Sequence, residues 1–279
     1  MTAPPLLDIE DLRVSFPSDG GAVEVVRGVS LTLGRERLGI VGESGSGKTL
    51  TGRAVLGLVP PPGRVTARRL AFDGIDLLSA GEKRLRALRG RRMAMVMQDP
   101  RFSLNPVMTV GRQIMEALRD FSPAQARRTA LEALEAVRIR DPERVFSAYP
   151  HELSGGMGQR VMIAMMTAPG PDLLIADEPT SALDASVCAQ VMEVLDERVR
   201  ARGMGLLLIS HDLELVASFC DRVLVMYAGR VVEEIAAARL ADAVHPYTRG
   251  LLDAVPRIDR PRAELPVLAR DPAWAGDGR

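Results

Sequence analysis

The sequence predicts an α/β fold with a largely parallel core sheet, an N-terminal antiparallel β-subdomain and an inserted helical subdomain. Three observations support this fold. Short apolar runs alternate with helical stretches over most of the chain, residues 99–168 interrupt that alternation, and residues 6–33 contain pieces in which apolar and polar side chains alternate. Alternating strands and helices are typical of α/β proteins.

The core strands are predicted from near-continuous apolar runs, which are typical of parallel strands that are covered on both faces. Five such runs occur, at residues 38–41, 93–97, 173–176, 206–209 and 223–226. Helical segments lie between them. We therefore expect the core to be a largely parallel sheet.

The N-terminal subdomain and the insertion have different patterns. Strand-like pieces such as residues 12–16 predict antiparallel strands within residues 6–33. Residues 99–168 contain no buried strand comparable to those of the core. Ser122, followed by proline and then by Gln125, has the pattern of a helix start, and the helix is expected to run through residues 127–137.

The C-terminal residues show little periodicity. The pattern weakens after about residue 236, and residues 256–279 are rich in proline. Such a segment predicts an extended tail. The tail contains no cysteine.

The net charge and the length of the apolar runs disfavour some classes of function. Lys and Arg number 36, as do Asp and Glu, so the formal net charge is zero and the basic excess of most nucleic-acid binders is absent. No apolar run reaches the roughly 20 residues that span a bilayer, and the N-terminus does not resemble a signal peptide. Any membrane role is therefore expected to need a docking partner.

The two cysteines, Cys188 and Cys220, lie far apart and lack metal-ligand spacing. Both fall in apolar helical patterns. We expect buried, reduced thiols, which suit a reducing compartment.

A phosphate-binding loop is predicted where an apolar strand meets a helical stretch at residues 50–58. Its residues fit the pattern G-x-x-x-x-G-K-[ST] and are Gly42, Glu43, Ser44, Gly45, Ser46, Gly47, Lys48 and Thr49. Glycines let several backbone N–H groups point at one anion, and the helix N-terminus adds partial positive charge. Lys48 is expected to reach the β- and γ-phosphates, and the Thr49 hydroxyl to ligate Mg²⁺. The context favours a P-loop NTPase core of the RecA-like type over a chance glycine-rich turn.

Two adjacent acids end the apolar strand 173–176. Asp177 is placed to hold the Mg²⁺ that Thr49 ligates, and Glu178 to polarise the attacking water as a general base. Charged groups at the tip of a buried strand are costly unless they have a use. A pair of solvated turn residues is the alternative, and the upstream phosphate loop disfavours it.

Residues 153–160 predict a second helix start that can bind an anion. Ser154 is its expected cap, and Gly155 and Gly156 have no side chains to cover their backbone amides. The segment resembles the signature of ABC ATPases, which P-loop GTPases and small-molecule kinases lack. The resemblance implies that Ser154, Gly155, Gly156 and Gln159 contact ATP held by the opposite subunit. Met157 and Gly158 depart mildly from the commonest form of this signature.

Four further positions match the ABC pattern in chain order. Gln98 resembles the Q-loop glutamine, which senses Mg²⁺ and water, and Asp184 lies in a segment that resembles the D-loop of the dimer interface. His211 resembles the H-loop histidine that contacts the γ-phosphate. Phe16 occupies the place of the aromatic residue that stacks on adenine. The resemblance implies catalytic roles for Gln98 and His211 beside Glu178, with Gln98 also near the metal. Taken alone, His211 would be a helix cap and Phe16 a core residue.

Two stretches narrow the resemblance from ABC ATPases in general to one subfamily of importers. Residues 98–106 and 245–252 are similar to segments of importers for di- and oligopeptides and for nickel, although 245–252 could be a plain turn leading into a helix. The resemblance covers about residues 6–260. It implies an ABC ATPase domain at 6–255, with the helical subdomain at 99–168 and the tail at 256–279.

The resemblance also implies partners and a location. ATP and Mg²⁺ would be bound, and two transmembrane permease subunits would hold the chain at the cytoplasmic face of the cell membrane. A second ABC ATPase subunit would complete the motor, with a heterodimer favoured over a homodimer. An extracytoplasmic solute-binding protein would act indirectly, and no nucleic acid is expected.

Alternative functions remain. The transported solute is expected to be a peptide, with nickel or a nickel chelate as the alternative. An ABC exporter is disfavoured by residues 245–252. A soluble ABC ATPase of DNA repair usually carries long coiled-coil or zinc insertions, and a translation-type ABC protein usually has two motor domains. Neither feature is found here.

Overall fold

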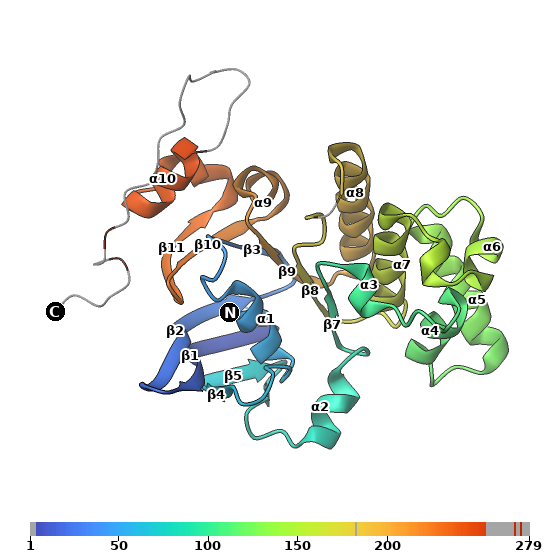
Figure 1. Cartoon of the computed structure of the whole chain (residues 1–279), viewed down its shortest axis with the longest axis horizontal. Coiled ribbons are helices and arrows are strands. Elements are labelled where there is room, and N and C mark those ends of the chain that lie inside the picture. Colours follow the sequence, from blue (N-terminus) through green and yellow to red (C-terminus); the bar gives the residue numbers. More distant parts are fainter. Residues whose placement is uncertain (1–3, 182, 255–270, 272–273, 275–279) are drawn as a thin grey trace. The chain divides into compact units, whose positions relative to one another are not determined.

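The computed structural model describes residues 4–181, 183–254, 271 and 274, and it divides into two compact units (Figure 1). The first unit contains the described residues up to Ala80 and from Leu207 onward. The second contains Gly81–Leu206. The predicted extended tail, residues 256–279, lies outside the described residues except for Asp271 and Trp274.

An antiparallel sheet forms the N-terminal part of the first unit and confirms the predicted β-subdomain. Its strands are β1 (Leu7–Ser18), β2 (Gly21–Leu33), β4 (Arg64–Thr66), β5 (Arg69–Phe72) and β6 (Ile75–Asp76), in the order β2-β1-β5-β6 with β4 paired to β1. Strands β4–β6 extend the sheet beyond the predicted segment. They do so because Leu70 and Phe72, 1% and 0% exposed, add apolar side chains to its buried face.

The five predicted core strands are all present, and their apolar residues are buried as expected, except that Met97 lies beyond the end of β7 and is half-buried. In the first unit, β3 (Arg37–Val41) pairs in parallel with β10 (Arg222–Tyr227), which pairs antiparallel with β11 (Arg230–Ala236). In the second unit, β7 (Met93–Val96) pairs in parallel with β8 (Leu173–Asp177). Strand β9 (Gly205–Ser210) leads the chain from the second unit back to the first.

Helices of the first unit pack closely on these strands. They are α1 (Lys48–Val55), α9 (Leu213–Phe219), the 3₁₀ turn η2 (Ala237–Asp242) and α10 (Pro246–Ala254). A Cβ at Gly39 of β3 would lie 2.1 Å from Val216 Cγ1 and 3.2 Å from Cys220 Sγ. The absence of a side chain at Gly39 therefore lets α9 approach the sheet.

The second unit is mainly helical, and no strand lies between its residues 100 and 167. Its helices are α2 (Glu82–Leu88), α3 (Pro100–Ser103), α4 (Val110–Ala117), α5 (Pro123–Ala136), α6 (Pro142–Ser147), η1 (Pro150–Glu152), α7 (Gly155–Thr167) and α8 (Ala185–Arg202). Apolar side chains such as Val110, Ile114, Ala130 and Leu134 are fully buried among them. The predicted helical insertion is thus confirmed in its secondary structure.

The two cysteines have different environments. Cys220 is buried and free, and desolvation raises the pKa of its thiol to about 12. Cys188 is also free but only half-buried, so the prediction of a buried thiol is wrong there. Its position in the first turn of α8 leaves the sulfur near the chain surface, where it donates to the carbonyl oxygens of Thr180 and Leu183.

Among the described residues, no helix combines the length and the apolar character that crossing a bilayer requires.

The capping box predicted at Ser122 is present at the start of α5. The Ser122 hydroxyl accepts from the Gln125 N–H at 3.4 Å, and the Ser122 N–H donates to Gln125 Oε1 at 3.2 Å. Each bond satisfies a backbone N–H group at the start of the helix, where the N–H groups have no intrahelical partner.

Replacing Ser122 by alanine should lower the free energy of unfolding by about 1 kcal/mol, because the cap is lost while the helix remains. Urea denaturation followed by circular dichroism measures this change. Ser122→Asp is the control and should keep most of the stability, since aspartate also caps helices well. An equal loss of unfolding free energy in both variants would show that the loss does not come from the missing cap.

Candidate nucleotide-binding site

The loop with the phosphate-binding motif joins β3 to α1 in the first unit. Gly42 has a φ of 152° and Gly47 a φ of 96°, a backbone region that favours glycine. A Cβ at Gly42 would lie only 2.1 Å from the carbonyl oxygen of Met226 on β10. Both the dihedral angle and the lack of space therefore require glycine where the loop begins.

The loop contains a buried cation and an unsatisfied hydroxyl. Lys48 is 5% exposed, and its Nζ donates to the carbonyl oxygens of Gly42 at 2.7 Å and Glu43 at 2.8 Å. The Ser46 hydroxyl is buried and has no hydrogen-bond partner within the described part of the chain. Burial of such groups is costly unless a ligand uses them, so the loop fits the phosphates of a nucleotide.

The N-terminus of α1 adds to this fit. Its N-cap is Gly47, which has no side chain to cap the first amides of the helix, and the helix N-terminus contributes partial positive charge. Thr49 is half-buried in the first turn. The remaining motif residues follow one another along the loop: Glu43 is half-buried, and Ser44 and Gly45 are exposed.

Two more predicted residues belong to the first unit. Phe16 on β1 is half-buried, and a Cβ at Gly63 would lie 2.7 Å from its ring, so the ring packs directly on the Gly63 backbone. His211 is exposed after β9. The cap of α9 is Asp212, whose carboxylate accepts from the Leu215 N–H at 3.0 Å, so a capping role does not account for His211.

The predicted carboxylate pair lies in the second unit. Asp177 ends β8 and is 4% exposed. Glu178 follows it, half-buried, with a φ of 46°. Left-handed backbone is uncommon for glutamate and is often found at functional sites. The turn after β8 therefore orients Glu178 differently from a continued strand.

The predicted signature starts α7 in the second unit. Ser154 is its N-cap, and its hydroxyl accepts from the Met157 N–H at 3.3 Å. Ser154 and Gly155 are exposed. A Cβ at Gly156 would lie 2.5 Å from Val187 Cγ1, so glycine allows the helix start to pack on α8. A cavity of about 410 Å³ borders these residues together with Asp184.

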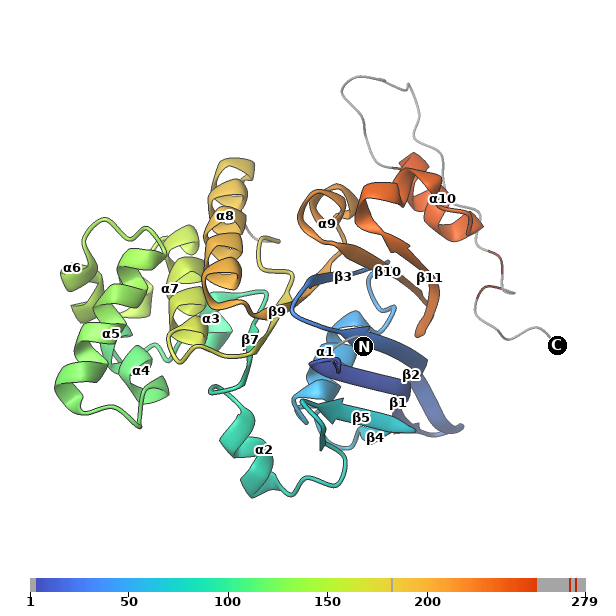
Figure 2. The ribbon, with the colours of Figure 1, turned by 180° about the vertical axis from the view of Figure 1, so that it is seen from behind.

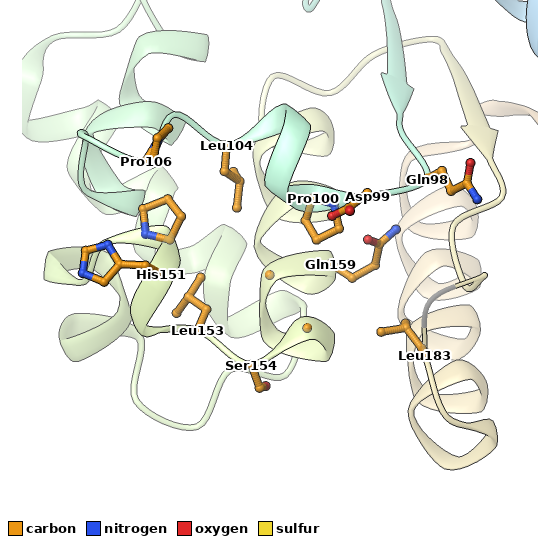
Figure 3. Close-up of a pocket in the computed structure, with 13 residues that line it drawn as sticks. Gln98, Asp99, Pro100, Leu104, Pro106, His151, Leu153, Ser154, Gln159 and Leu183 are labelled. Carbon is orange, nitrogen blue, oxygen red and sulfur yellow. The ribbon is translucent and has the colours of Figure 1, made fainter.

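Gln98 and Gln159 line a second cavity, of about 520 Å³ (Figure 3). Gln98 is exposed, whereas Gln159 is 1% exposed and its side chain extends toward Asp99. The buried Gln159 Nε2 has no hydrogen-bond partner among the described residues. Gln159 therefore differs from the exposed residues Ser154 and Gly155, because its side chain lies inside its own unit.

Asp184 is the N-cap of α8. Its carboxylate accepts from the Ser186 hydroxyl at 2.7 Å and from the Val187 N–H at 3.0 Å. These bonds, the Ser186 bond first, lower the pKa of Asp184 below its usual value. The carboxylate is exposed and ionised at neutral pH, so it can both cap α8 and face a partner.

The first unit also contains a contact that the sequence motifs did not predict. The hydroxyl of Tyr247, in α10, accepts from the Glu43 N–H of the phosphate loop at 3.1 Å. Tyr247 lies in the segment 245–252, whose resemblance to importer sequences carries no information about this contact. Some 200 residues separate the two partners in sequence, so only the folded chain brings them together.

Curated relatives align over nearly the whole chain. The oligopeptide transport ATP-binding protein of Salmonella typhimurium is 46% identical over 272 residues, which is 96% of this chain and 81% of the relative. The dipeptide transport ATP-binding protein of Haemophilus influenzae is 48% identical over 268 residues, which is 94% of this chain and 81% of the relative.

Solved structures share the fold. An ATP-binding cassette determined as a dimer in a post-hydrolysis state, bound to ADP and Pi, has a TM-score of 0.72 at 26% identity and covers 83% of this chain and 98% of its own. CbiO1 of Clostridium perfringens has a TM-score of 0.73 at 26% identity, over 86% of this chain and 91% of its own. The sequence also matches the ABC transporter family over residues 26–181. The chain therefore belongs to the ABC transporter family.

Proposed function

We propose that the chain is the ATP-hydrolysing motor subunit of an ABC importer for di- or oligopeptides. The observation that carries this proposal is identity of 46–48% over 94–96% of the chain to proteins named for oligopeptide and dipeptide transport. Proteins this similar, aligned over their motor motifs, support peptide over nickel as the solute.

ATP is proposed to bind at the phosphate loop. The buried Lys48 would leave the carbonyl oxygens of its own loop and pair with the β- and γ-phosphates, while loop amides and the start of α1 donate to phosphate oxygens. Phe16 would stack on adenine. The half-buried ring on Gly63 presents an aromatic surface that is already held in place.

Thr49, Asp177 and Gln98 are proposed to hold Mg²⁺, directly or through water. Their oxygen donors suit this hard cation. When bound, Mg²⁺ neutralises charge on the β- and γ-phosphates. Because Asp177 is buried at the end of β8, its carboxylate would attract a bound cation more strongly than an exposed carboxylate would.

Glu178 is proposed as the general base. Its carboxylate would accept a proton from the attacking water as the water oxygen bonds to the γ-phosphorus and the bond to the β-phosphate oxygen breaks, releasing ADP and phosphate. The left-handed backbone at Glu178 turns its side chain away from the strand direction. His211 would contact the γ-phosphate, and Gln98 would sense the metal and the water.

A second ATPase subunit is proposed to complete each site. Ser154, Gly155 and Gly156 would contact ATP held by the partner, and Asp184 would lie at the interface, since Ser154, Gly155 and Asp184 are exposed. The burial of Gln159 argues that it supports the helix start rather than touching that ATP. We favour a heterodimer. Two transmembrane permeases would hold this motor at the cytoplasmic face of the membrane, and an extracytoplasmic solute-binding protein would deliver the peptide.

Lys48→Ala should abolish measurable ATP binding, because the loop then has no cation for the phosphates. Titration calorimetry of the purified chain with MgATP measures this loss. Lys83→Ala is a matched control, since Lys83 is the only other lysine of the chain and is exposed on α2. Unchanged affinity in Lys48→Ala would remove the lysine from this role.

Glu178→Gln should keep ATP binding and lower the rate of hydrolysis by about 10²- to 10⁴-fold, the usual contribution of a general base. Phosphate release measures the rate, and size-exclusion chromatography with ATP should reveal trapped closed dimers. Glu132→Gln, at an exposed position of α5, is the control. Turnover at the wild-type rate would contradict the assignment.

The transport role is tested by affinity purification of the tagged chain from detergent-solubilised membranes of its source. We expect two polytopic permeases and a second ATPase to co-elute. Uptake of radiolabelled peptide into proteoliposomes of that complex, with labelled nickel as the comparison, then identifies the solute. If no polytopic protein co-elutes, or if nucleic-acid proteins do, the proposed importer function is refuted. The proposed ATPase function is not affected by that result.

A further inference from the structure

Tyr247 lies at the start of α10, within the His-Pro-Tyr segment that the ATPase motifs leave unexplained. It is 0% exposed and is the largest fully buried side chain among the residues that the structure describes. Its hydroxyl accepts from the Glu43 N–H at 3.1 Å. We propose that Tyr247 is a positioning residue for ATP binding, which holds the first peptide group of the phosphate loop in its nucleotide-binding orientation. This inference rests on the proposed ATP site.

The bond acts on the peptide group that also contacts the loop lysine. The carbonyl of Gly42 and the N–H of Glu43 belong to one planar peptide group and point in opposite directions. Lys48 Nζ donates to that carbonyl at 2.7 Å, and Tyr247 accepts from that N–H at 3.1 Å. Because the group is rigid, fixing its N–H also fixes the direction of its carbonyl. Tyr247 thus restrains the loop at the point where Lys48 is held.

The far end of the loop is restrained from the β10–β11 turn. The Gly229 N–H donates to the Ser46 carbonyl oxygen at 3.1 Å. Ala228, just before it, has a φ of 45°, as the tight turn requires. Tyr227, at the end of β10, packs its ring on Tyr247 with centroids 4.6 Å apart. Both restraints therefore come from one region of the first unit. We call it the aromatic corner, because the rings of Tyr227, Tyr247 and Trp274 lie close together there.

Several contacts keep Tyr247 in place. The Glu233 carboxylate of β11 accepts from the N–H groups of Val244 at 2.8 Å and His245 at 3.3 Å, just before α10. The Tyr247 N–H donates to His245 Nδ1 at 3.2 Å. The ring of Trp274 lies 6.1 Å from that of Tyr247 and 5.9 Å from those of Tyr227 and His245. Figures 1 and 2 both show α10 beside β11.

This arrangement predicts an effect on binding rather than on chemistry. A loop that is already held in shape loses little freedom when the phosphates arrive, and this favours affinity. Without the hydroxyl, the Glu43 N–H loses its bond to Tyr247, and the first peptide group is restrained less. The general base and the signature belong to the second unit, whereas Tyr247 belongs to the first, so we expect kcat to stay unchanged.

Tyr247→Phe in the full-length chain is the test, since it removes one oxygen and keeps the ring. The dissociation constant for the Mg²⁺ complex of the non-hydrolysable analogue AMP-PNP should rise about two- to tenfold, the usual effect of one hydrogen bond. The KM for ATP should rise similarly while kcat stays unchanged. Tyr227→Phe is the matched control, because it deletes a hydroxyl from the adjacent ring and leaves the Glu43 bond intact. It should bind like wild type.

Trp274 is the only tryptophan of the chain and reports on the aromatic corner. Its emission spectrum without nucleotide should be the same in wild type and Tyr247→Phe, which shows that the packing survives. Tyr247→Ala, which also removes the ring, should shift that emission and weaken binding further. Weakened binding by Tyr247→Phe with unchanged Trp274 emission supports positioning by the hydroxyl.

Three outcomes overturn the inference: wild-type affinity in Tyr247→Phe, an equal loss in Tyr227→Phe, or a fall in kcat with no change in KM. Lys48→Ala, measured in parallel, separates this failure from failure of the ATP site. If wild type binds the analogue and Lys48→Ala does not, the site stands and only the role of Tyr247 is refuted. If wild type does not bind, or Lys48→Ala binds equally well, the proposed site itself is wrong.

Discussion

The close approach of the phosphate loop to β10 is the constraint on which the nucleotide site depends. The Gly42 backbone passes so near the Met226 carbonyl that no side chain fits between them. This contact brings the loop down onto the sheet, where Lys48 is buried at the start of α1. It also brings the loop within reach of the β10–β11 turn and of α10. A larger residue at position 42 would lift the loop away from each of these contacts.

The helices that start at the predicted motifs differ in their N-caps. The starts of α7, α8 and α9 are capped by Ser154, Asp184 and Asp212. The start of α1 makes no side-chain capping bond. A side-chain cap satisfies amides that a ligand could otherwise use. The start of α1 therefore has no side-chain cap at Gly47, whereas at α7 the Ser154 hydroxyl already accepts from the Met157 N–H.

The functional groups are divided between the two units. The first contains the phosphate loop, Phe16, His211 and Tyr247, which are proposed to bind the nucleotide. The second contains Gln98, the signature and the pair Asp177–Glu178, which are proposed to sense and hydrolyse it. Ser154, Gly155 and Asp184 are exposed on the second unit, where we propose that a partner subunit binds.

The sequence by itself determined the core strands, the helical insertion, the capped start of α5 and the family. These depend on local patterns, namely apolar runs, turn residues and contiguous motifs, which a chain of residues displays directly. It did not predict β4–β6, the exposure of Cys188 or the burial of Gln159, because each depends on which neighbours cover a side chain. The Tyr247–Glu43 bond belongs to the same class. Its partners lie on different elements far apart in the chain, so only tertiary packing, through β10, β11 and α10, decided that they meet.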